Sequence, residues 1–245
     1  MRILISGASI AGPSLAWWLS RAGHETTIVE RAPALREGGF AVDFRGDVHL
    51  RVLARMGLLD AIRARQTHVR ELTFVDESGA TRASLPGWFT GGDVEILRGD
   101  LSRILFDATC ASTEYVFGDS IATLTQTPDG VDVTFERGAP RRFDLVLGAD
   151  GLHSNVRQLA FGDEAQFLRF GGYYVAGGFD VPNHLGLERC AVDYGVPGRS
   201  VSLASYHDPA TAIPTFVFAS APLAVDRRDL DAQKRILVER FGGLG

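Results

Sequence analysis

The sequence predicts an α/β fold with a parallel sheet and a second, mainly antiparallel β-sheet domain. Two segments, at residues 3–23 and 144–157, each have the pattern of a strand, a tight turn and a helix. Repeated strand–helix units of this kind are typical of parallel sheets covered by helices. The alternating, β-rich pattern of residues 171–222 indicates the antiparallel sheet.

The first strand–turn–helix unit begins at the N-terminus. Residues 3–5 form an apolar run, typical of a central strand that is buried on both faces. Residues 7–12 form the turn, and the following helix is expected to end near Gly23. A second strand follows over residues 26–29, and Glu30 stands at its end.

The turn of this unit is a candidate phosphate-binding site. In a dinucleotide fingerprint the first glycine, here Gly7, allows a sharp turn, and the last, Gly12, allows close packing of helix and strand. The helix N-terminus offers N–H groups to a pyrophosphate. Ser9 replaces the middle glycine, and Glu30 stands where a carboxylate accepts hydrogen bonds from ribose hydroxyls. A strand–turn–helix unit without a ligand stays open as the alternative.

The second unit has a predicted buried strand that begins at residue 143 or 144, followed by the tight turn Asp150-Gly151 and a helix that carries Arg157. The two glycine-marked turns together suggest one extended ligand that is held from two sides, such as FAD. The alternative is that Asp150 only caps the N-terminus of the helix.

A third candidate element is the helix expected over residues 100–105. Asp100 is the expected N-cap, and the apolar residues that follow have helical spacing. Arg98 precedes this helix, so its guanidinium could reach a phosphate or the edge of a flavin. The alternative for Arg98 is a surface ion pair.

The remaining elements follow from local patterns. We expect a short strand within residues 38–46, an apolar helical stretch at 50–59, a hairpin at 71–83, strands at 114–117, 120–126, 131–135 and 143–147, and a closing helix at about 229–240.

Composition excludes several functional classes. The 245 residues are 45% apolar, which is enough for a sizeable core. A net charge of −5 without a basic block gives no support to nucleic-acid binding. Cys110 and Cys190 lack CxxC spacing, and the six histidines are scattered, so neither a redox dithiol nor a metal site is expected.

Membrane association is not expected either. The apolar run at the N-terminus is interrupted by Ser6, Gly7 and Ser9, unlike the apolar core of a signal peptide. No stretch approaches the roughly 18 apolar residues of a membrane-spanning helix. We therefore expect a cytoplasmic protein.

With these motifs the chain resembles the single-component FAD-dependent monooxygenases related to para-hydroxybenzoate hydroxylase. Within that family it most resembles the tetracycline-inactivating and antibiotic-tailoring hydroxylases. The resemblance rests on GASIAG with Glu30, on the helix start at Arg98, and on GADGLHSNVR. The last element fits the family's DGxxSxxR pattern and is the most specific of the three.

The resemblance implies a Rossmann-like FAD-binding domain, formed by residues 1–71 and 95–165, and a substrate domain, formed by residues 72–94 and 166–245. It implies no catalytic side chain and no metal ligand, because the cofactor carries the chemistry. The residues that it implies for FAD binding are Gly7, Ser9, Ile10, Ala11, Gly12, Glu30, Arg31, Asp43, Arg98, Asp150, Gly151, Ser154 and Arg157.

The implied activity is the hydroxylation of a small aromatic, polycyclic or polyketide-like compound. NAD(P)H would be the co-substrate and O2 would react at flavin C4a to give a hydroperoxide. Two alternatives stay open: a flavin-fold binding protein without turnover, and a flavin-dependent halogenase. Resemblance to halogenases implies an active-site lysine, and Lys234 is the only lysine in the chain.

One element of the family pattern is missing from the sequence. The family has a Gly-Asp motif after its substrate domain, which contacts the FAD ribitol and phosphates, and this chain lacks it. We therefore expect the FAD-binding domain to be incomplete in these 245 residues, and FAD to be held weakly.

Overall fold

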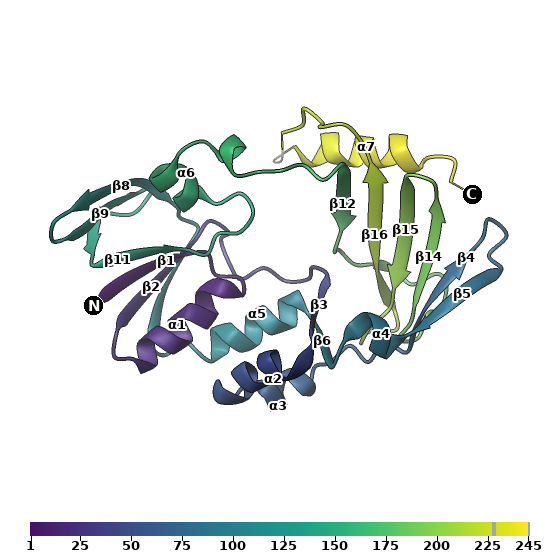
Figure 1. Cartoon of the computed structure of the whole chain (residues 1–245), viewed down its shortest axis with the longest axis horizontal. Helices are drawn as coiled ribbons and strands as arrows, with labels where there is room; N and C mark the ends of the chain where they lie inside the picture. The colour runs from purple at the N-terminus through teal and green to yellow at the C-terminus, as the bar shows by residue number, and fades with distance from the viewer. Residues whose placement is uncertain (227–228, 245) are drawn as a thin grey trace. The chain divides into compact units, whose positions relative to one another are not determined.

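The computed structural model describes residues 1–226 and 229–244 and divides the chain into two compact units (Figure 1). Unit 1 contains residues 1–37, 51–65 and 98–169, and unit 2 contains residues 38–50, 66–97 and the described residues from 170 on. The fold class expected from the sequence, a Rossmann-like domain with a second, mainly antiparallel sheet domain, is confirmed.

Unit 1 is built on a four-stranded parallel sheet in the order β11-β1-β2-β7. The strands are β1 (Arg2–Ser6), β2 (Glu25–Glu30), β7 (Thr113–Phe117) and β11 (Leu145–Gly148). A three-stranded antiparallel sheet belongs to the same unit and consists of β8 (Ile121–Thr127), β9 (Gly130–Phe135) and β10 (Arg141–Phe143).

The core of unit 1 lies on both faces of β1, because successive side chains of a strand point to opposite faces. Leu4 packs with Ile121, Val133 and Phe143 of the antiparallel sheet. Ile3 and Ile5 pack in a second cluster with Ala16 of helix α1. These helices belong to unit 1: α1 (Ala11–Arg21), α3 (Leu59–Arg63), α5 (Arg98–Asp107), α6 (Asn155–Phe161) and the 3-10 turn η1 (Glu164–Gln166). Helix α2 (Gly46–Arg55) connects the two units along the chain.

Unit 2 is built on a seven-stranded sheet in the order β12-β16-β15-β14-β4-β5, with β13 also paired to β16. All pairs are antiparallel except β14 with β4. The strands are β4 (Glu71–Val75), β5 (Thr81–Pro86), β12 (Tyr173–Gly177), β13 (Val181–Pro182), β14 (Ala191–Val196), β15 (Arg199–Ala204) and β16 (Thr211–Ala219).

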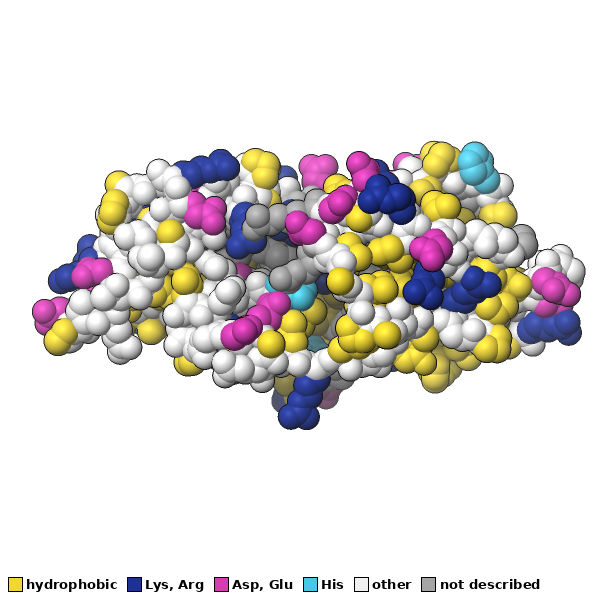
Figure 2. Space-filling view, turned by 90° about the horizontal axis from the view of Figure 1, so that it is seen from above, with side chains coloured by type: hydrophobic (Ala, Val, Ile, Leu, Met, Phe, Trp, Pro, Cys, Tyr) yellow, Lys and Arg dark blue, Asp and Glu magenta, His cyan; other side chains and the backbone are white. Residues whose placement is uncertain are grey.

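Helix α7 (Leu230–Phe241) begins at the N-cap Asp229 and packs against this sheet through its last turn. The ring of Phe241 contacts Phe216 and Phe218 of β16. In Figure 2, which looks onto the side of α7, hydrophobic side chains of this unit lie between charged ones. The unit also contains the short helix α4 (Gly87–Gly91) and the two-stranded ribbon of β3 (Ala41–Phe44) and β6 (Val94–Leu97).

Two local predictions were wrong. Residues 143–147 were expected to form one buried strand, but β10 and β11 separate at Asp144. The backbone N–H of Asp144 donates to Arg2 O, and its carboxylate accepts a hydrogen bond from Arg2 N–H. The strand is also not fully buried, because β11 lies at the edge of the described sheet and Leu145 is 39% exposed. Asp100 is not an N-cap, because α5 already begins at Arg98; its carboxylate accepts a hydrogen bond from Arg65 at 2.7 Å instead.

The units also differ from the expected domain boundaries. Residues 38–50 and 66–71 group with unit 2, because β3 pairs with β6 and Gly39 N–H donates to Gly178 O. Within the part of the chain that the structure describes, every helix is too short or too polar to cross a membrane.

We predict that Gly12→Ala destabilises the fold. An added Cβ would lie 1.9 Å from the carbonyl oxygen of Gly7, a backbone atom that cannot rotate away. Overpacking of this kind costs about 1–3 kcal/mol or more in the free energy of unfolding, which urea titration measures. Gly171→Ala is the control, since nothing lies within 4 Å of its added Cβ. Equal stability of the two variants would contradict the account.

Candidate functional site

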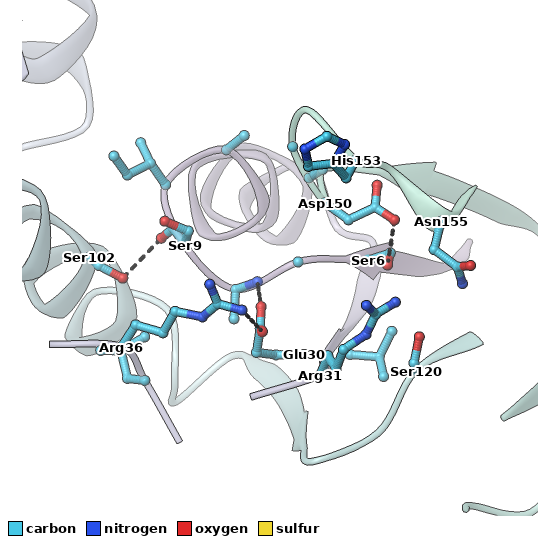
Figure 3. A pocket seen from close by; sticks show the side chains of 18 of the residues that line it. Ser6, Ser9, Glu30, Arg31, Arg36, Ser102, Ser120, Asp150, His153 and Asn155 are labelled. Atoms are coloured by element: carbon cyan, nitrogen blue, oxygen red, sulfur yellow. Dashed lines mark hydrogen bonds and ion pairs between the residues drawn. The ribbon is translucent and has the colours of Figure 1, made fainter. Parts of the chain in front are cut away.

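A pocket of about 440 Å³ lies in unit 1, at the carboxyl ends of its parallel strands (Figure 3). Ligands of open α/β sheets bind at this edge, outside the carboxyl ends of the strands. The pocket is lined by Ser6, Gly7, Ala8, Ser9, Ile10, Ala11, Val29, Glu30, Arg31, Leu35, Arg36, Arg98, Ser102, Asp119, Ser120, Ala149, Asp150, Gly151, His153 and Asn155.

The turn after β1 depends on its two glycines. Gly7 has a φ of +110°, a conformation that side chains rarely adopt, and its N–H donates to Val29 O at 2.8 Å. A Cβ on Gly7 would lie 2.5 Å from Ala149 O, and a Cβ on Gly12 would meet Gly7 O. The first glycine thus brings the turn after β1 against the turn after β11. The second brings α1 against the first turn.

The same turn presents unused hydrogen-bond donors to the pocket. Within residues 1–226 and 229–244, the N–H groups of Ser9 and Ile10 have no partner, and no side chain caps α1. Pro13, in the first turn of α1, has no N–H to satisfy. Because the N-terminus of a helix also carries a partial positive charge, this turn is suited to an anion.

Ser9 and Ser102 connect the turn to helix α5. Ser102 Oγ donates to Ser9 O at 3.1 Å, as Figure 3 shows. The side chain of Ser9 is exposed, so its hydroxyl is available to a ligand. Serine in place of the middle glycine of the fingerprint therefore does not block the access of a ligand to the turn.

Glu30 lies at the end of β2 and holds the turn through its carboxylate. It accepts hydrogen bonds from Ala8 N–H and Ala32 N–H, both at 2.9 Å. Its Oε1 lies 3.7 Å from Arg36 Nη2, as Figure 3 shows by a dashed line. Its side chain is only 14% exposed. A carboxylate has about four acceptor positions, so Glu30 keeps capacity for hydroxyl donors in the pocket.

Asp150 lies in the turn after β11 and organises the start of α6. Its carboxylate accepts hydrogen bonds from Ser154 Oγ at 2.5 Å, Val156 N–H at 3.0 Å and Ser6 Oγ at 3.3 Å. Gly151 follows with a φ of +82°. The N-cap of α6 is Ser154, whose Oγ accepts from Arg157 N–H, so Asp150 supports the helix start without being its cap.

Four residues predicted for cofactor binding do not line this pocket: Gly12, Asp43, Ser154 and Arg157. Arg157 Nη2 donates to Leu152 O at 2.8 Å and lies 3.2 Å from Glu164. Through this bond, and through the bond from Ser154 to Asp150, these two residues hold the turn at Asp150 without lining the pocket. Asp43 lies on β3 of unit 2 and pairs with Arg45. The other nine predicted residues are lining residues.

Arg31 and Arg98 both line the pocket, and both are exposed. Neither has an ion-pair partner in the described part of the chain, in contrast to Arg36. Their guanidinium groups are therefore available to an anionic ligand. Among the described residues, no three His, Cys, Asp or Glu side chains gather as a metal site would require.

Sequence reasoning missed Asp119, Ser120 and Asn155 in the pocket wall. Asp119 and Ser120 follow β7, the fourth parallel strand, so the rule that strand ends share one edge could have found them. Asn155 Nδ2 donates to Ile121 O at 2.7 Å and joins α6 to the same wall.

Asp119 is a buried acceptor. It takes hydrogen bonds from the backbone N–H groups of Ser120, Arg137 and Gly138, at 2.8, 3.0 and 2.8 Å. Burial raises the pKa of the Asp119 carboxyl, but these hydrogen bonds outweigh it, so the pKa lies below its usual value. The ionised carboxylate therefore fixes the loop after β7.

We predict that Asp119→Asn lowers the free energy of unfolding by about 1–3 kcal/mol at pH 7, because one amide cannot accept all three N–H groups. Because the pKa of Asp119 is lower in the folded than in the unfolded protein, its carboxylate stabilises the fold at pH values above its unfolded pKa of about 3.9. This stabilisation is lost as the pH falls through the lower, folded-state pKa. The deficit of the variant should thus be constant down to about pH 5 and shrink below pH 4.

Urea titrations of both proteins at several pH values measure this deficit. Asp129→Asn is the matched control, because Asp129 is exposed, and it should change stability by less than about 0.5 kcal/mol. A deficit that persists unchanged at pH 3 would contradict the assignment to an ionised carboxylate.

Comparison with known proteins agrees with this geometry. The family model of the FAD binding domain matches residues 1–188. An uncharacterized protein of Mycobacterium tuberculosis is 45% identical over 98% of this chain and 65% of its own length. A flavin-dependent monooxygenase of Legionella longbeachae is 35% identical over 100% of this chain and 63% of its own.

A solved structure, that of the tetracycline destructase Tet(51), superposes with a TM-score of 0.85 at 34% identity. It is matched over 100% of this chain and 63% of its own length. The chain thus spans somewhat less than two thirds of the length of these relatives. The motifs, the pocket and the family match together show that this chain belongs to the FAD binding domain family.

Proposed function

We propose that this chain belongs to an FAD-dependent monooxygenase that hydroxylates a small aromatic or polyketide-like compound with NAD(P)H and O2. The observation that carries the proposal is that two turns, 144 residues apart along the chain at Ser6 and Asp150, line one pocket with unused N–H donors. The similarity to flavin-dependent monooxygenases and to a tetracycline destructase supports the choice of reaction.

The residues present fit FAD. The N–H groups at Ser9 and Ile10, with the start of α1, would hold the pyrophosphate, and Arg98 and Arg31 would balance its charge. Glu30 would accept from the ribose hydroxyls. Asp150 and Gly151 would contact the flavin half from the turn after β11. When bound, FAD supplies the redox chemistry, since it accepts electrons from NAD(P)H and reacts with O2.

The protein's own task is then to bind, orient and exclude water rather than to supply a catalytic acid or base. The turns of unit 1 fix the cofactor, and we propose that the sheet of unit 2 supplies the substrate contacts. The tetracycline destructase similarity favours a polycyclic, hydroxylated substrate.

We predict that Glu30→Ala weakens FAD binding about ten- to hundredfold, which corresponds to the loss of charge-assisted hydrogen bonds worth about 1.5–3 kcal/mol. The titration is followed by quenching of flavin fluorescence. Glu30→Gln keeps an oxygen for Ala8 N–H and loses the charge, so its affinity should lie between those of the other two proteins.

The control for this series is Glu25→Ala. Glu25 is exposed at the opposite end of the same strand, and its replacement should leave FAD affinity unchanged. Equal FAD affinity of Glu30→Ala and Glu25→Ala would refute the role of Glu30.

The proposed reaction is tested by following NAD(P)H oxidation by the FAD-loaded protein in the presence of candidate phenols and tetracyclines. Isotopically labelled O2 should leave one labelled oxygen atom in the product. Bound FAD without substrate-stimulated NAD(P)H oxidation would instead support a flavin-fold binding protein without turnover.

A further inference from the structure

A second hollow, of about 690 Å³, lies within unit 2 and is separate from the pocket of unit 1. It forms where three connections meet at one end of the sheet. β4 and β14 are parallel and begin at this end, and β15, antiparallel to β14, ends there. The residues before β4, before β14 and after β15 therefore converge, and the volume is in the range of small-molecule sites.

The backbone is strained at two points of the wall. His68, before β4, and Arg189, before β14, have φ values of +52° and +51°. They are the non-glycine residues with positive φ among those described, and both line the hollow. Such strain persists only where the surroundings enforce it, and it is frequent at ligand sites. Here Arg70 N–H donates to Arg189 O at 2.7 Å and connects the two segments.

The charge of the hollow is predominantly positive. Arg70 and Arg189 line it together with two imidazoles, and the carboxylate present is that of Glu188. Arg70 Nη2 donates to the backbone oxygen of Glu188 at 2.5 Å and lies 3.9 Å from its carboxylate. Both side chains are largely exposed, so the ion pair neutralises little of the charge of Arg70. Arg189 makes no ion pair within the described residues. An exposed guanidinium without a partner is suited to an oxyanion.

Two residues that carry hydroxyl groups, Ser205 and Tyr206, complete the wall. Ser205 is fully buried, and its Oγ has no hydrogen-bond partner among the described residues, a state that costs free energy unless a ligand or water satisfies it. Its backbone is fixed by the bond from Ser205 N–H to Cys190 O. Burial, together with the nearby carboxylate of Glu95, raises the pKa of the neighbouring Tyr206 to about 12, so that phenol remains protonated at neutral pH.

We propose that this hollow is a second binding site, which takes the carboxylate or phosphate group of a small organic anion. Arg70 and Arg189 provide the charge, and Ser205 and Tyr206 provide hydroxyl donors. The strained backbone at His68 and Arg189 holds the two segments in place before the ligand arrives, which lowers the entropic cost of binding. The proposal does not depend on the reaction proposed above.

The test is a titration of the purified 245-residue chain with inorganic phosphate, and separately with benzoate, at constant ionic strength. Binding is followed by the NMR signals of the histidine rings and by calorimetry. The two ions distinguish a phosphate from a carboxylate ligand. We expect saturable binding of at least one of them with displaced signals of His68.

Arg189→Asn removes the guanidinium. Asparagine adopts the left-handed backbone conformation of this position more readily than arginine does, so this variant should fold. It should bind the ion at least tenfold more weakly, and Ser205→Ala should also bind it more weakly. Arg82→Gln is the matched control, because Arg82 is an exposed arginine of β5 outside the hollow, and it should bind as the unchanged chain does.

Arg98→Gln separates the two pockets, since phosphate could also bind in unit 1. Binding that Arg98→Gln abolishes and Arg189→Asn leaves intact would place the ion in unit 1 and overturn the proposal. Absence of saturable binding by either ion would overturn it as well.

Discussion

The close approach of two backbone turns is the constraint on which the site of unit 1 depends. The turn after β1 and the turn after β11 touch at Gly7 and Ala149, where any side chain on Gly7 would collide with a carbonyl oxygen. The contact is held by Ala149 N–H, which donates to Ser6 O at 2.8 Å, and by the parallel pairing of the two strands. Because of this approach, residues from the beginning and the middle of the chain face one pocket.

This contact also explains why the pocket can receive an anion. The glycines leave space beside the turn, and among the described residues no partner is found for the N–H groups of Ser9 and Ile10. Glu30 fixes the turn from the opposite side through Ala8 N–H. The site is thus formed mainly by rigid backbone, which can position a ligand. This suits a cofactor that supplies the chemistry itself.

The DGxxSxxR pattern gains a physical meaning from the same network. Ser154 caps α6 and donates to Asp150, and Arg157 donates to Leu152 O, so the two residues that do not line the pocket hold the turn that does. The spacing of the motif is the spacing of a capped helix start. A sequence pattern can therefore mark a pocket through residues that do not line it.

Local chemistry accounts for what could be predicted. The apolar run of β1, the glycines at 7 and 12, and Glu30 at the end of β2 act within about 30 residues, and their arrangement followed from the sequence. The Asp150 turn was recognisable for the same reason, although the N-cap of α6 is Ser154 and not Asp150, which was the alternative considered.

Long-range pairing accounts for most of what could not be predicted. The position of Asp119 at a strand end was open to prediction, but the hydrogen bonds that fix it were not, because their donors, Arg137 and Gly138, lie across a hairpin. The break at Asp144 depends on its bonds to Arg2, which lies 142 residues away along the chain. The hollow of unit 2 combines residues from three separate connections, and neither its volume nor the unpartnered Ser205 hydroxyl leaves a pattern in the sequence.

A crystal structure of the chain soaked with FAD at saturating concentration would show directly which residues hold the cofactor. We expect the pyrophosphate at the N–H groups of Ser9 and Ile10, the ribose hydroxyls at Glu30, and the flavin half beside Asp150. A cofactor bound elsewhere, or an intact cofactor whose phosphates leave the turn after β1 untouched, would contradict this expectation.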